Sequence, residues 1–402
     1  MYRLEQDVYY VAGAKCATLY DSRCGSLYHL DRDAAQTLSG LLLKNTPNGE
    51  ESYDLVRYLV DKKLLASGSS TWTGDIHNLA EEPKISFAWI EVTTSCNLKC
   101  VHCYEGDTLR SAAEMSMETF VKIVDELREN NVRRIQLIGG EPLAAGHLRD
   151  FIRYASEWFD FVEVYTNGTL VDEDWVKFFK KHNIKLALSV YSYEQESHDK
   201  VTGVSGSWLK TNSAIRIISD SGVKYRVRNV LIKGVPLGCK GSCLYTLNPN
   251  KDVVRMVGRA NANLLSEENV IKRLITKRSF SSPIPKARVA RMVGGHNCFA
   301  THLYFDVHGE VYPCVMERRI SHGNILSAPL AKLLRADVLR FNKDRIEECK
   351  ECEFRYFCFD CRPDSMGKTI TTKPWYCTYQ PQTGQWTDQD SFISNLRRQY
   401  NF

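Results

Sequence analysis

Three cysteines in one short loop, Cys96, Cys100 and Cys103, offer a compact set of metal ligands. They follow the mostly apolar run 85–92, which predicts a buried strand that delivers the loop. A closed structural zinc site uses four protein ligands, whereas a site that does chemistry keeps one position open. On a [4Fe–4S] cluster, normally held by four cysteines, three thiolates leave one iron free to bind a substrate. A partial zinc site and a chance grouping of cysteines are the alternatives.

Composition and length indicate a globular protein in a reducing compartment. The 402 residues, 43% of them hydrophobic, leave room for two to three domains. No apolar stretch is long enough to span a bilayer, and the first residues lack the layout of a signal peptide, so we expect a cytoplasmic protein without a membrane partner. In that compartment the 14 cysteines are expected to bind metal rather than to form disulfides. The net charge of +5 is too small to indicate a nucleic-acid partner.

Between residues 84 and about 260 the chain alternates strand and helix patterns. The expected strands lie at 85–93, 134–138, 161–165, 184–190 and 225–232. The expected helices begin at Ser116, lie near 146–158, and run through Trp175–Phe179 and Ile215–Ile218. Repeated strand–helix units predict an α/β fold with parallel strands, as an open sheet or a barrel. Ligand sites in such folds gather at the carboxyl ends of the strands.

Polar signatures follow three of these strands. Gly139-Gly140-Glu141-Pro142 comes after the second strand, Thr166-Asn167-Gly168 after the third, and Ser189 lies at the end of the fourth. Glycines let backbone groups approach a ligand closely, and a carboxylate beside them could hold an ammonium group. Each signature alone is a common turn. Arrayed at successive strand ends near a cysteine loop, they predict one site.

Residues 1–75 are predicted to form a separate small domain. Its three short strands are expected at 8–11, 16–20 and 25–30, and a helix capped by Asp31 and a second helix around 53–60 follow them. Strands followed by helices favour a winged-helix-like fold. The domain resembles the precursor-peptide recognition element of peptide-modifying enzymes, and this resemblance implies that a leader peptide adds as a strand beside the third strand. A capping domain without a ligand is the alternative.

The central cysteines and glycines carry a second resemblance. Cys96, Cys100 and Cys103, with the run Gly139–Pro142, resemble the radical S-adenosylmethionine (SAM) superfamily. The resemblance implies a partial (β/α)6 TIM-type barrel, whose [4Fe–4S] cluster leaves one iron to chelate the amino and carboxylate groups of SAM. One-electron reduction, by a donor such as a flavodoxin or ferredoxin, then cleaves SAM to methionine and a 5′-deoxyadenosyl radical. That radical abstracts hydrogen from an unactivated C–H bond.

The resemblance also assigns roles to single residues. His102 fills the aromatic position that packs against adenine, and Ser189 would bind ribose or carboxylate. Gly139, Gly140 and Glu141 would bind the methionyl amine. Tyr191 stands where many relatives carry an acidic residue. The predicted cofactor-binding residues are His102, Gly139, Gly140, Glu141, Asn167 and Ser189.

The C-terminal third carries a dense set of cysteines. They are Cys298, Cys314, Cys349, Cys352, Cys358, Cys361 and Cys377. A zinc ribbon built on two Cys-x-x-Cys pairs is one interpretation. The pattern resembles instead the SPASM extension of radical SAM enzymes, with a β-hairpin over 305–314 that turns at His308-Gly309. This resemblance implies two auxiliary [4Fe–4S] clusters, for three clusters in all.

The family's interleaved wiring implies two ligand sets. One auxiliary cluster would take Cys349, Cys352, Cys358 and Cys377, and the other would take Cys298, Cys314 and Cys361. The second set is one ligand short, so its open iron could bind the thiolate of a substrate cysteine, a soft ligand suited to iron–sulfur. The candidates that could complete it instead are His296, His302, Cys239 and Cys243.

We therefore expect three domains: a recognition domain at 1–75, a radical SAM partial barrel at 84–290 and a SPASM domain at 291–402, with a polar linker at 68–83. This order is typical of maturases of ribosomally made peptides. The predicted activity is hydrogen abstraction from a precursor peptide, with a thioether cross-link as the leading product. A carbon–carbon cross-link, a sulfatase-type formylglycine maturase, an epimerase and a non-catalytic zinc scaffold are the alternatives.

Overall fold

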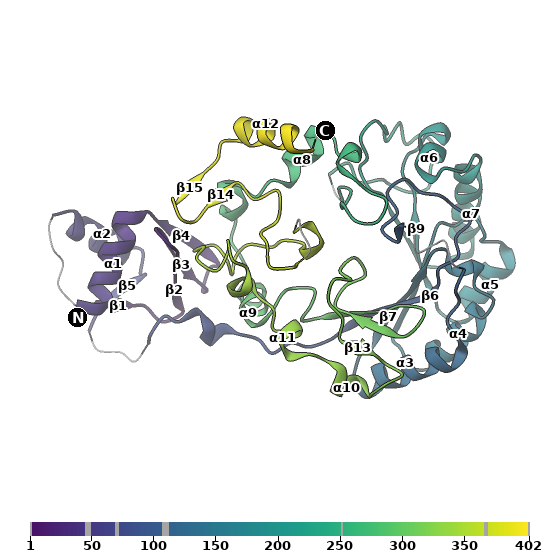
Figure 1. The fold of residues 1–402 in the computed structure, drawn as a ribbon, viewed down its shortest axis with the longest axis horizontal. Coiled ribbons are helices and arrows are strands. Elements are labelled where there is room, and N and C mark those ends of the chain that lie inside the picture. The colour runs from purple at the N-terminus through teal and green to yellow at the C-terminus, as the bar shows by residue number, and fades with distance from the viewer. Residues whose placement is uncertain are drawn as a thin grey trace. The chain divides into compact units, whose positions relative to one another are not determined.

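The computed structural model describes residues 2–44, 50–68, 72–106, 112–250, 252–365 and 369–400. The chain folds into two compact units, each assembled from segments far apart in the sequence (Figure 1). The first unit comprises 1–83, 274–300 and 339–392, and the second comprises 84–273, 301–338 and 393–402. Across the described residues, no helix combines the length and the apolar character needed to cross a bilayer.

An eight-stranded sheet forms the centre of the second unit, in the order β10-β9-β8-β7-β6-β11-β12-β13. The six strands from β10 to β11 are parallel to their neighbours, whereas β12 and β13 are antiparallel. The bounds are β6 Phe87–Thr93, β7 Arg134–Gly139, β8 Phe161–Thr166, β9 Lys185–Ser189, β10 Tyr225–Arg228, β11 His302–Phe305, β12 Glu310–Tyr312 and β13 Gly323–Asn324. The predicted α/β fold with a parallel barrel-type sheet is confirmed.

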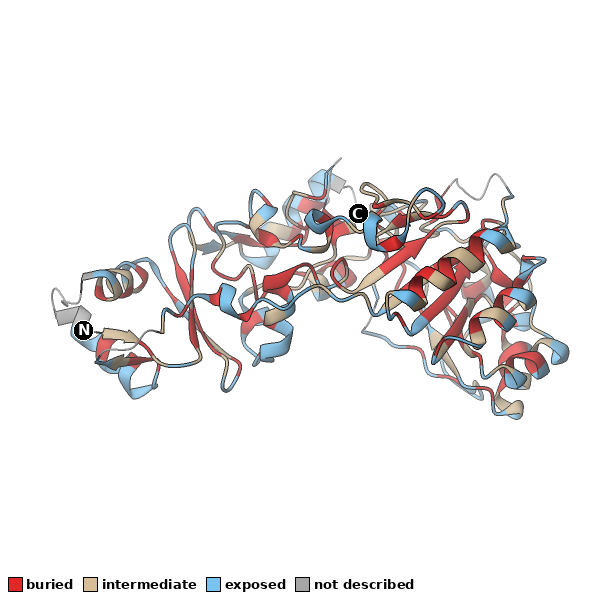
Figure 2. Ribbon diagram, turned by 90° about the horizontal axis from the view of Figure 1, so that it is seen from below, coloured by how far each residue is buried: buried red, intermediate tan, exposed pale blue. Residues whose placement is uncertain are grey.

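The helices α3 Met117–Glu129, α4 Leu148–Ser156, α5 Glu173–Lys181 and α7 Ser207–Ser221 cover the outer side of the sheet (Figure 1). The unit also contains α6 Gln195–Thr202 and α8 Glu267–Arg273. The Ser116 hydroxyl caps α3 by accepting a hydrogen bond from the backbone N–H of Thr119 at 3.1 Å. Figure 2 shows the inner faces of these elements as buried and their outer faces as exposed. The short polar helix α6 was not predicted.

Strand β10 ends four residues earlier than the sequence predicts. The Asn229 side chain bonds both the carbonyl and the N–H of Asn248, at 2.9 Å and 2.8 Å, and this side-chain pairing takes the place of a strand ladder. Only a single parallel bridge, Leu231 to Val253, follows it among the described residues. The predicted hairpin over 305–314 is confirmed, with β11 and β12 antiparallel and Gly309 at a φ of +82° in the turn.

A three-stranded antiparallel sheet, in the order β2-β3-β4, forms the N-terminal part of the first unit. Side chains alternate across it: Leu19 and Tyr28 pack with the helices α1 and α2, and Tyr20 and His29 face the other way. On that second face Tyr20 contacts Phe357 and His29 stacks on Phe354, at ring-centroid distances of 5.2 Å and 5.1 Å. The bounds are β2 Val8–Ala12, β3 Ala17–Asp21, β4 Ser26–Leu30, α1 Arg32–Lys44 and α2 Glu50–Asp61.

A short ribbon of β1 Tyr2–Leu4 and β5 Leu65–Ser67, which the sequence analysis did not predict, completes this part. Of the expected linker, residues 69–71 lie outside the described residues, and the remainder is packed rather than extended. The Trp72 indole donates to the Val8 carbonyl at 3.0 Å, and the Tyr10 N–H donates to the Gly74 carbonyl at 2.9 Å. The segment therefore covers one edge of the sheet. The winged-helix assignment stays a prediction.

The C-terminal segments contain short elements joined by tight turns. They are α9 Lys286–Gly294, α10 Leu330–Leu333, α11 Ala336–Leu339, β14 Tyr379–Gln380, β15 Gln385–Trp386 and α12 Gln389–Tyr400. Between these elements the chain buries large aromatic side chains, among them Phe354, Tyr356 and Phe357.

We predict that a buried histidine makes the second unit sensitive to acid. The Nδ1 atom of His322 accepts from the Arg335 N–H at 3.1 Å, and burial, with a smaller contribution from the Arg335 charge, lowers the pKa of His322 to about 4, against a raising effect of Asp337. A lowered pKa means that the unfolded chain binds the proton more tightly. The stabilisation is complete above pH ~6.5 and is lost as the pH falls toward 4, by up to about 3 kcal/mol.

The test compares urea unfolding of His322→Asn with that of the wild type at pH 7 and pH 5. The Asn amide oxygen can accept the same hydrogen bond without titrating, so the wild type should lose about 2 kcal/mol more than the variant over this interval. His308→Asn, at an exposed position, is the matched control and should keep the wild-type pH dependence. Equal losses in His322→Asn and the wild type would contradict the prediction.

Candidate functional site

The cysteine loop leaves the carboxyl end of β6 and is held by backbone hydrogen bonds to α6. The N–H groups of Lys99 and Val101 donate to the carbonyls of Thr202 and Val201, at 2.8 Å and 3.0 Å. These carbonyls lie at the end of α6, where a helix has unsatisfied acceptors. The unpredicted helix α6 therefore positions the loop that carries Cys96, Cys100 and Cys103.

Two glycines at the end of β7 allow a close backbone approach to the same loop. A Cβ atom on Gly139 would lie 2.3 Å from the Thr93 carbonyl oxygen, and one on Gly140 would lie 2.3 Å from that of Ser95. The N–H of Gly140 instead donates to Thr93 and that of Glu141 to Ser95, both at 2.8 Å. From the sequence, these glycines are predicted to let backbone groups approach a ligand. In the structure they first let the backbone at Thr93 and Ser95 approach the end of β7.

One pocket at the strand ends brings most of the predicted residues together. Its lining includes the three loop cysteines, His102, Gly139, Gly140, Asn167, Ser189 and Tyr191. They come from the ends of β6, β7, β8 and β9, as the fold predicts for a ligand site. Their role in binding a cofactor stays a prediction.

Glu141 lies outside this lining, because its carboxylate is turned into the protein. The side chain is fully buried and accepts from the Thr166 hydroxyl at 2.6 Å, the Asn167 N–H at 2.7 Å and the Leu143 N–H at 3.1 Å. Burial raises the pKa of Glu141, while these three donors lower it. In the described geometry the carboxylate joins the ends of β7 and β8, and its predicted contact with an amine is untested.

Asn97 and Arg259 are two residues that the sequence analysis missed. The Asn97 amide donates to the Thr169 hydroxyl at 2.7 Å and accepts from the Asn167 amide at 2.9 Å, which links the cysteine loop to the turn after β8. Arg259 donates from its backbone to the Cys103 carbonyl at 2.9 Å and from its guanidinium to the Cys100 carbonyl at 3.2 Å. Asn97 could have been predicted, because it lies between the predicted ligands Cys96 and Cys100 in the sequence. Arg259 does not follow a predicted strand, so the sequence gives no comparable signal for it.

Gly258 makes the contact of Arg259 with the loop possible. Its φ is +65°, and a Cβ atom would lie 2.3 Å from the Cys103 carbonyl oxygen. Both the backbone conformation and the close approach require glycine here. The guanidinium adds a positive charge to a pocket lined by three thiols.

His102 packs edge to face against Tyr191, with ring centroids 4.8 Å apart. Burial lowers the pKa of His102 to about 4, with a further contribution from the Arg259 charge, so the imidazole is neutral at pH 7. Its buried Nδ1 atom has no hydrogen-bond partner in the described structure. The neutral His102 ring with its unpartnered nitrogen suits a flat aromatic ligand that donates a hydrogen bond.

The donor set of the pocket suits an iron–sulfur cluster. Burial raises the pKa of Cys96 to about 11 and that of Cys100 to about 12, and the neighbouring thiols add to the shift at Cys100. None of the three forms a disulfide. Such raised pKa values mean that the three thiols lose their protons readily only when a cation is present. This is expected of metal-binding cysteines before the metal binds. The residues present therefore fit three ligands to a [4Fe–4S] cluster, and the open iron fits the amino and carboxylate groups of SAM.

Four of the C-terminal cysteines lie close together in the first unit. Burial raises the pKa of both Cys358 and Cys352. Negative charge on Cys377 and Cys349 adds to the rise at Cys358, and negative charge on Glu353, and then on Cys358 and Cys349, adds to the rise at Cys352. The cations of Lys343 and Arg362 act in the opposite direction on Cys349 and Cys358. Grouped thiols beside buried cations fit the predicted ligand set of one auxiliary cluster, Cys349, Cys352, Cys358 and Cys377.

The second predicted set divides between the units, since Cys298 and Cys361 belong to the first and Cys314 to the second. Its assembly into a cluster stays a prediction. Among the candidates to complete it, His296 accepts from the Cys298 N–H at Nδ1 and contacts the Asp360 carbonyl through Nε2, both at 3.3 Å. His302 stacks on Trp89, Cys243 lies near the Asn212 amide, and Cys239 is exposed. Both ring nitrogens of His296 thus have other partners.

Comparisons with known proteins give two family matches. Residues 90–245 match the radical SAM superfamily, and residues 298–353 match the iron–sulfur cluster-binding domain SPASM. The antilisterial bacteriocin subtilosin biosynthesis protein AlbA of Bacillus subtilis is 28% identical over 77% of this chain and 75% of its own. An AdoMet-dependent heme synthase of Methanosarcina barkeri is 24% identical over 73% of this chain and 96% of its own.

Two solved structures share the fold at low identity. The enzyme anSMEcpe with bound AdoMet and the Cp18Cys peptide is 20% identical, with a TM-score of 0.54, over 73% of this chain and 94% of its own. Streptococcus suis SuiB bound to the precursor peptide SuiA is 13% identical, with a TM-score of 0.55, over 92% of this chain and 98% of its own.

We predict that Gly140→Ala displaces the cysteine loop. The new Cβ atom would meet the Ser95 carbonyl at 2.3 Å, so the backbone must move, at a cost of about 1–3 kcal/mol. The expected result is a lower midpoint of thermal unfolding and a loss of about four irons per chain from anaerobically purified protein. Gly146→Ala is the matched control, because its Cβ would come no closer than 3.6 Å to the flexible Glu114 side chain. Full iron retention in Gly140→Ala would refute the assignment.

Proposed function

The chain belongs to the radical SAM superfamily and carries a SPASM domain, and on this premise we propose that it modifies a ribosomally synthesised precursor peptide by radical hydrogen abstraction. The observation that carries the proposal is a small antiparallel sheet that precedes the radical SAM region in the sequence. Its edge strand β4 pairs only with β3 among the described residues. An open strand edge binds an extended peptide through main-chain hydrogen bonds.

The cluster and SAM supply the 5′-deoxyadenosyl group that takes a hydrogen atom from substrate. The chain's own residues hold and orient these groups. The backbone pairing of Gly140 and Glu141 with Thr93 and Ser95 fixes the cysteine loop against β7. Asn97 and Asn167 tie the loop to β8, and Arg259 closes it from a third side. The pocket between these elements would then receive SAM with its adenine beside His102.

We assign recognition of the leader peptide to residues 1–75, radical chemistry to 84–290 and auxiliary clusters to 291–402. The other edge of the N-terminal sheet is covered, because Tyr10 on β2 pairs with Gly74 and Asp75. A leader that adds as a strand therefore has β4 as its place. The fold match to SuiB extends over 92% of the chain, and the match to anSMEcpe covers 73%.

The leading product is a thioether between a cysteine sulfur and a carbon of another residue. The reason is the predicted set Cys298, Cys314 and Cys361, which offers three thiolates to a cluster that can take four. A substrate thiolate is a suitable fourth ligand. Electrons would come from a donor such as a flavodoxin or ferredoxin. A carbon–carbon cross-link and a sulfatase-type formylglycine modification are the alternative outcomes.

We predict that Cys96→Ala abolishes reductive cleavage of SAM while the auxiliary clusters remain. The three loop cysteines hold one cluster, so iron should fall from about twelve to about eight per chain. The measurement is 5′-deoxyadenosine formation with dithionite as reductant, alongside iron content. Cys24→Ala, at an exposed position in the first unit, serves as the control and should keep both values. Persisting 5′-deoxyadenosine formation in Cys96→Ala would contradict the ligand assignment.

A precursor peptide without cysteine in its core distinguishes between the possible products. A thioether replaces one C–H and one S–H bond by a C–S bond, so a precursor peptide with a cysteine in its core should lose two hydrogens in mass. The same peptide with each cysteine of its core replaced by serine should be returned unchanged, although the leader still binds. Loss of two hydrogens from the serine peptide would remove the thioether and favour a carbon–carbon cross-link.

A further inference from the structure

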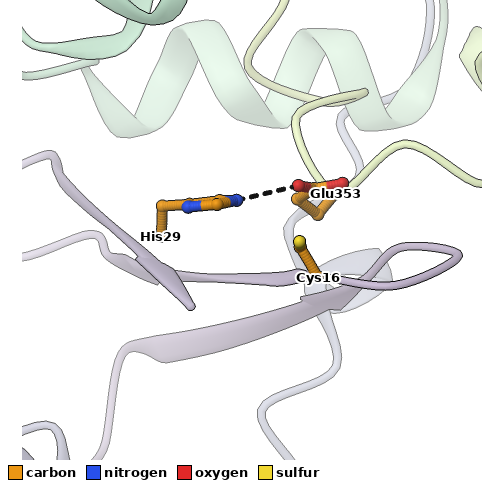
Figure 3. Close-up of side chains that lie close together, drawn as sticks. All are labelled: Cys16, His29 and Glu353. Carbon is orange, nitrogen blue, oxygen red and sulfur yellow. Dashed lines mark hydrogen bonds and ion pairs between the residues drawn. The ribbon is translucent and has the colours of Figure 1, made fainter. Parts of the chain in front are cut away.

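Cys16, His29 and Glu353 converge in the first unit (Figure 3). Their ligand atoms, one sulfur, one imidazole nitrogen and one carboxylate oxygen, all lie within 4.8 Å of one another. The Nε2 atom of His29 is 3.0 Å from Oε1 of Glu353. In the described part of the chain, this is the one such group of three found close enough to share a single ion.

The fold of the N-terminal sheet brings Cys16 and His29 to one face. Thr18 on β3 pairs with His29 on β4, and Cys16 precedes Thr18 by two residues, so its side chain points to the same side. Glu353 comes from the C-terminal part of the unit. One backbone and one side-chain hydrogen bond join the two parts: the Ala14 N–H donates to the Glu351 carbonyl at 2.8 Å, and the Arg355 guanidinium donates to the Ala12 carbonyl at 2.7 Å.

The Glu353 carboxylate is only partly satisfied by the protein. It is fully buried, and Oε1 accepts from His29 and from the Tyr379 hydroxyl. Its Oε2 atom is buried without a hydrogen-bond partner in the described structure. A buried carboxylate oxygen without a donor is costly, and a cation is one way to satisfy it.

Two glycines keep side chains out of the same space. A Cβ atom on Gly13 would lie 2.5 Å from Glu353 Oε2, and one on Gly384 would lie 2.7 Å from Cys16 Sγ. Gly384 also has a φ of +72°. A side chain at either position would therefore collide with a donor atom of the cluster of three.

We propose that Cys16, His29 and Glu353 bind a single Zn²⁺ ion. Sulfur, imidazole nitrogen and carboxylate oxygen are the three donor types that zinc accepts, and tetrahedral bond lengths place donor atoms about 3.3–3.6 Å apart, inside the observed spread. Binding displaces the thiol proton of Cys16 to solvent, and His29 coordinates through Nε2. One thiolate and one carboxylate then neutralise the ion, which suits a buried place. Tyr379 remains hydrogen-bonded to Glu353, and a water molecule takes the fourth position.

The ion would join the sheet of residues 1–75 to the segment that carries the cluster ligand Cys352, which precedes Glu353 in the chain. Zinc carries no redox chemistry of its own, so it fixes this junction at every oxidation state of the neighbouring cluster. The β4 strand that holds His29 is the edge proposed for the leader peptide. The zinc site itself does not depend on that function.

The test measures zinc and iron in holoprotein purified anaerobically and dialysed against a modest excess of zinc. Wild type should hold about one zinc per chain, and Cys16→Ser and His29→Gln should each fall below about a tenth of that, with iron unchanged. Cys24→Ser is the matched control, because it removes an exposed cysteine from the same small domain. The zinc X-ray absorption spectrum of the wild type should show one sulfur neighbour with the rest nitrogen or oxygen.

Three results would overturn the proposal: no zinc in the wild type, zinc retained by Cys16→Ser, or a spectrum with four sulfur neighbours, which would place the zinc among the cluster cysteines. Unchanged iron content and circular dichroism show that each variant is folded. As a second readout, a chelator that removes zinc should lower the thermal midpoint of the wild type and leave that of Cys16→Ser unchanged.

Discussion

The close approach of two backbone segments at the carboxyl ends of β6 and β7 determines the geometry of the pocket. Main-chain hydrogen bonds from Gly140 and Glu141 to Thr93 and Ser95 place the cysteine loop to within a few tenths of an ångström. No side chain beyond hydrogen fits between these segments. The glycines are therefore structural first, and any contact they make with a cofactor follows from that packing.

The second constraint is the pairing of buried charged side chains in the first unit. Lys343 is almost fully buried and pairs with Asp360 at 2.5 Å, and the fully buried Arg362 also pairs with Asp360. Burial raises the pKa of Cys349 and of Cys358, and the positive charges of Lys343 and Arg362 lower it. These cations would stabilise the thiolates that hold a cluster, so we expect the apoprotein to be less stable than the holoprotein.

The sequence predicted the parts of this protein that follow simple periodicities. The strands from β6 to β9 carry mostly apolar runs, and Ser116 and Asp31 mark helix starts through side-chain caps, which act within three residues. What it missed depends on contacts between distant segments. The helix α6 has a polar sequence and is stabilised by its place against the cysteine loop, and Glu353 meets Cys16 across more than three hundred residues. Local pattern carries no information on such pairs, nor on the turning of Glu141 away from the pocket.

The discontinuity of the first unit has a consequence for its synthesis. The face of β3 that carries Tyr20 packs against Phe357, which the ribosome adds more than three hundred residues later. At 5–20 residues per second this delay is roughly 15–70 s. During that time the aromatic face of the N-terminal sheet is uncovered, whereas the first five strands of the radical SAM sheet have already been synthesised. The order of translation therefore leaves this face of β3 uncovered until the C-terminal segments of the first unit are made, and the predicted ligand set Cys349, Cys352, Cys358 and Cys377 is complete only then.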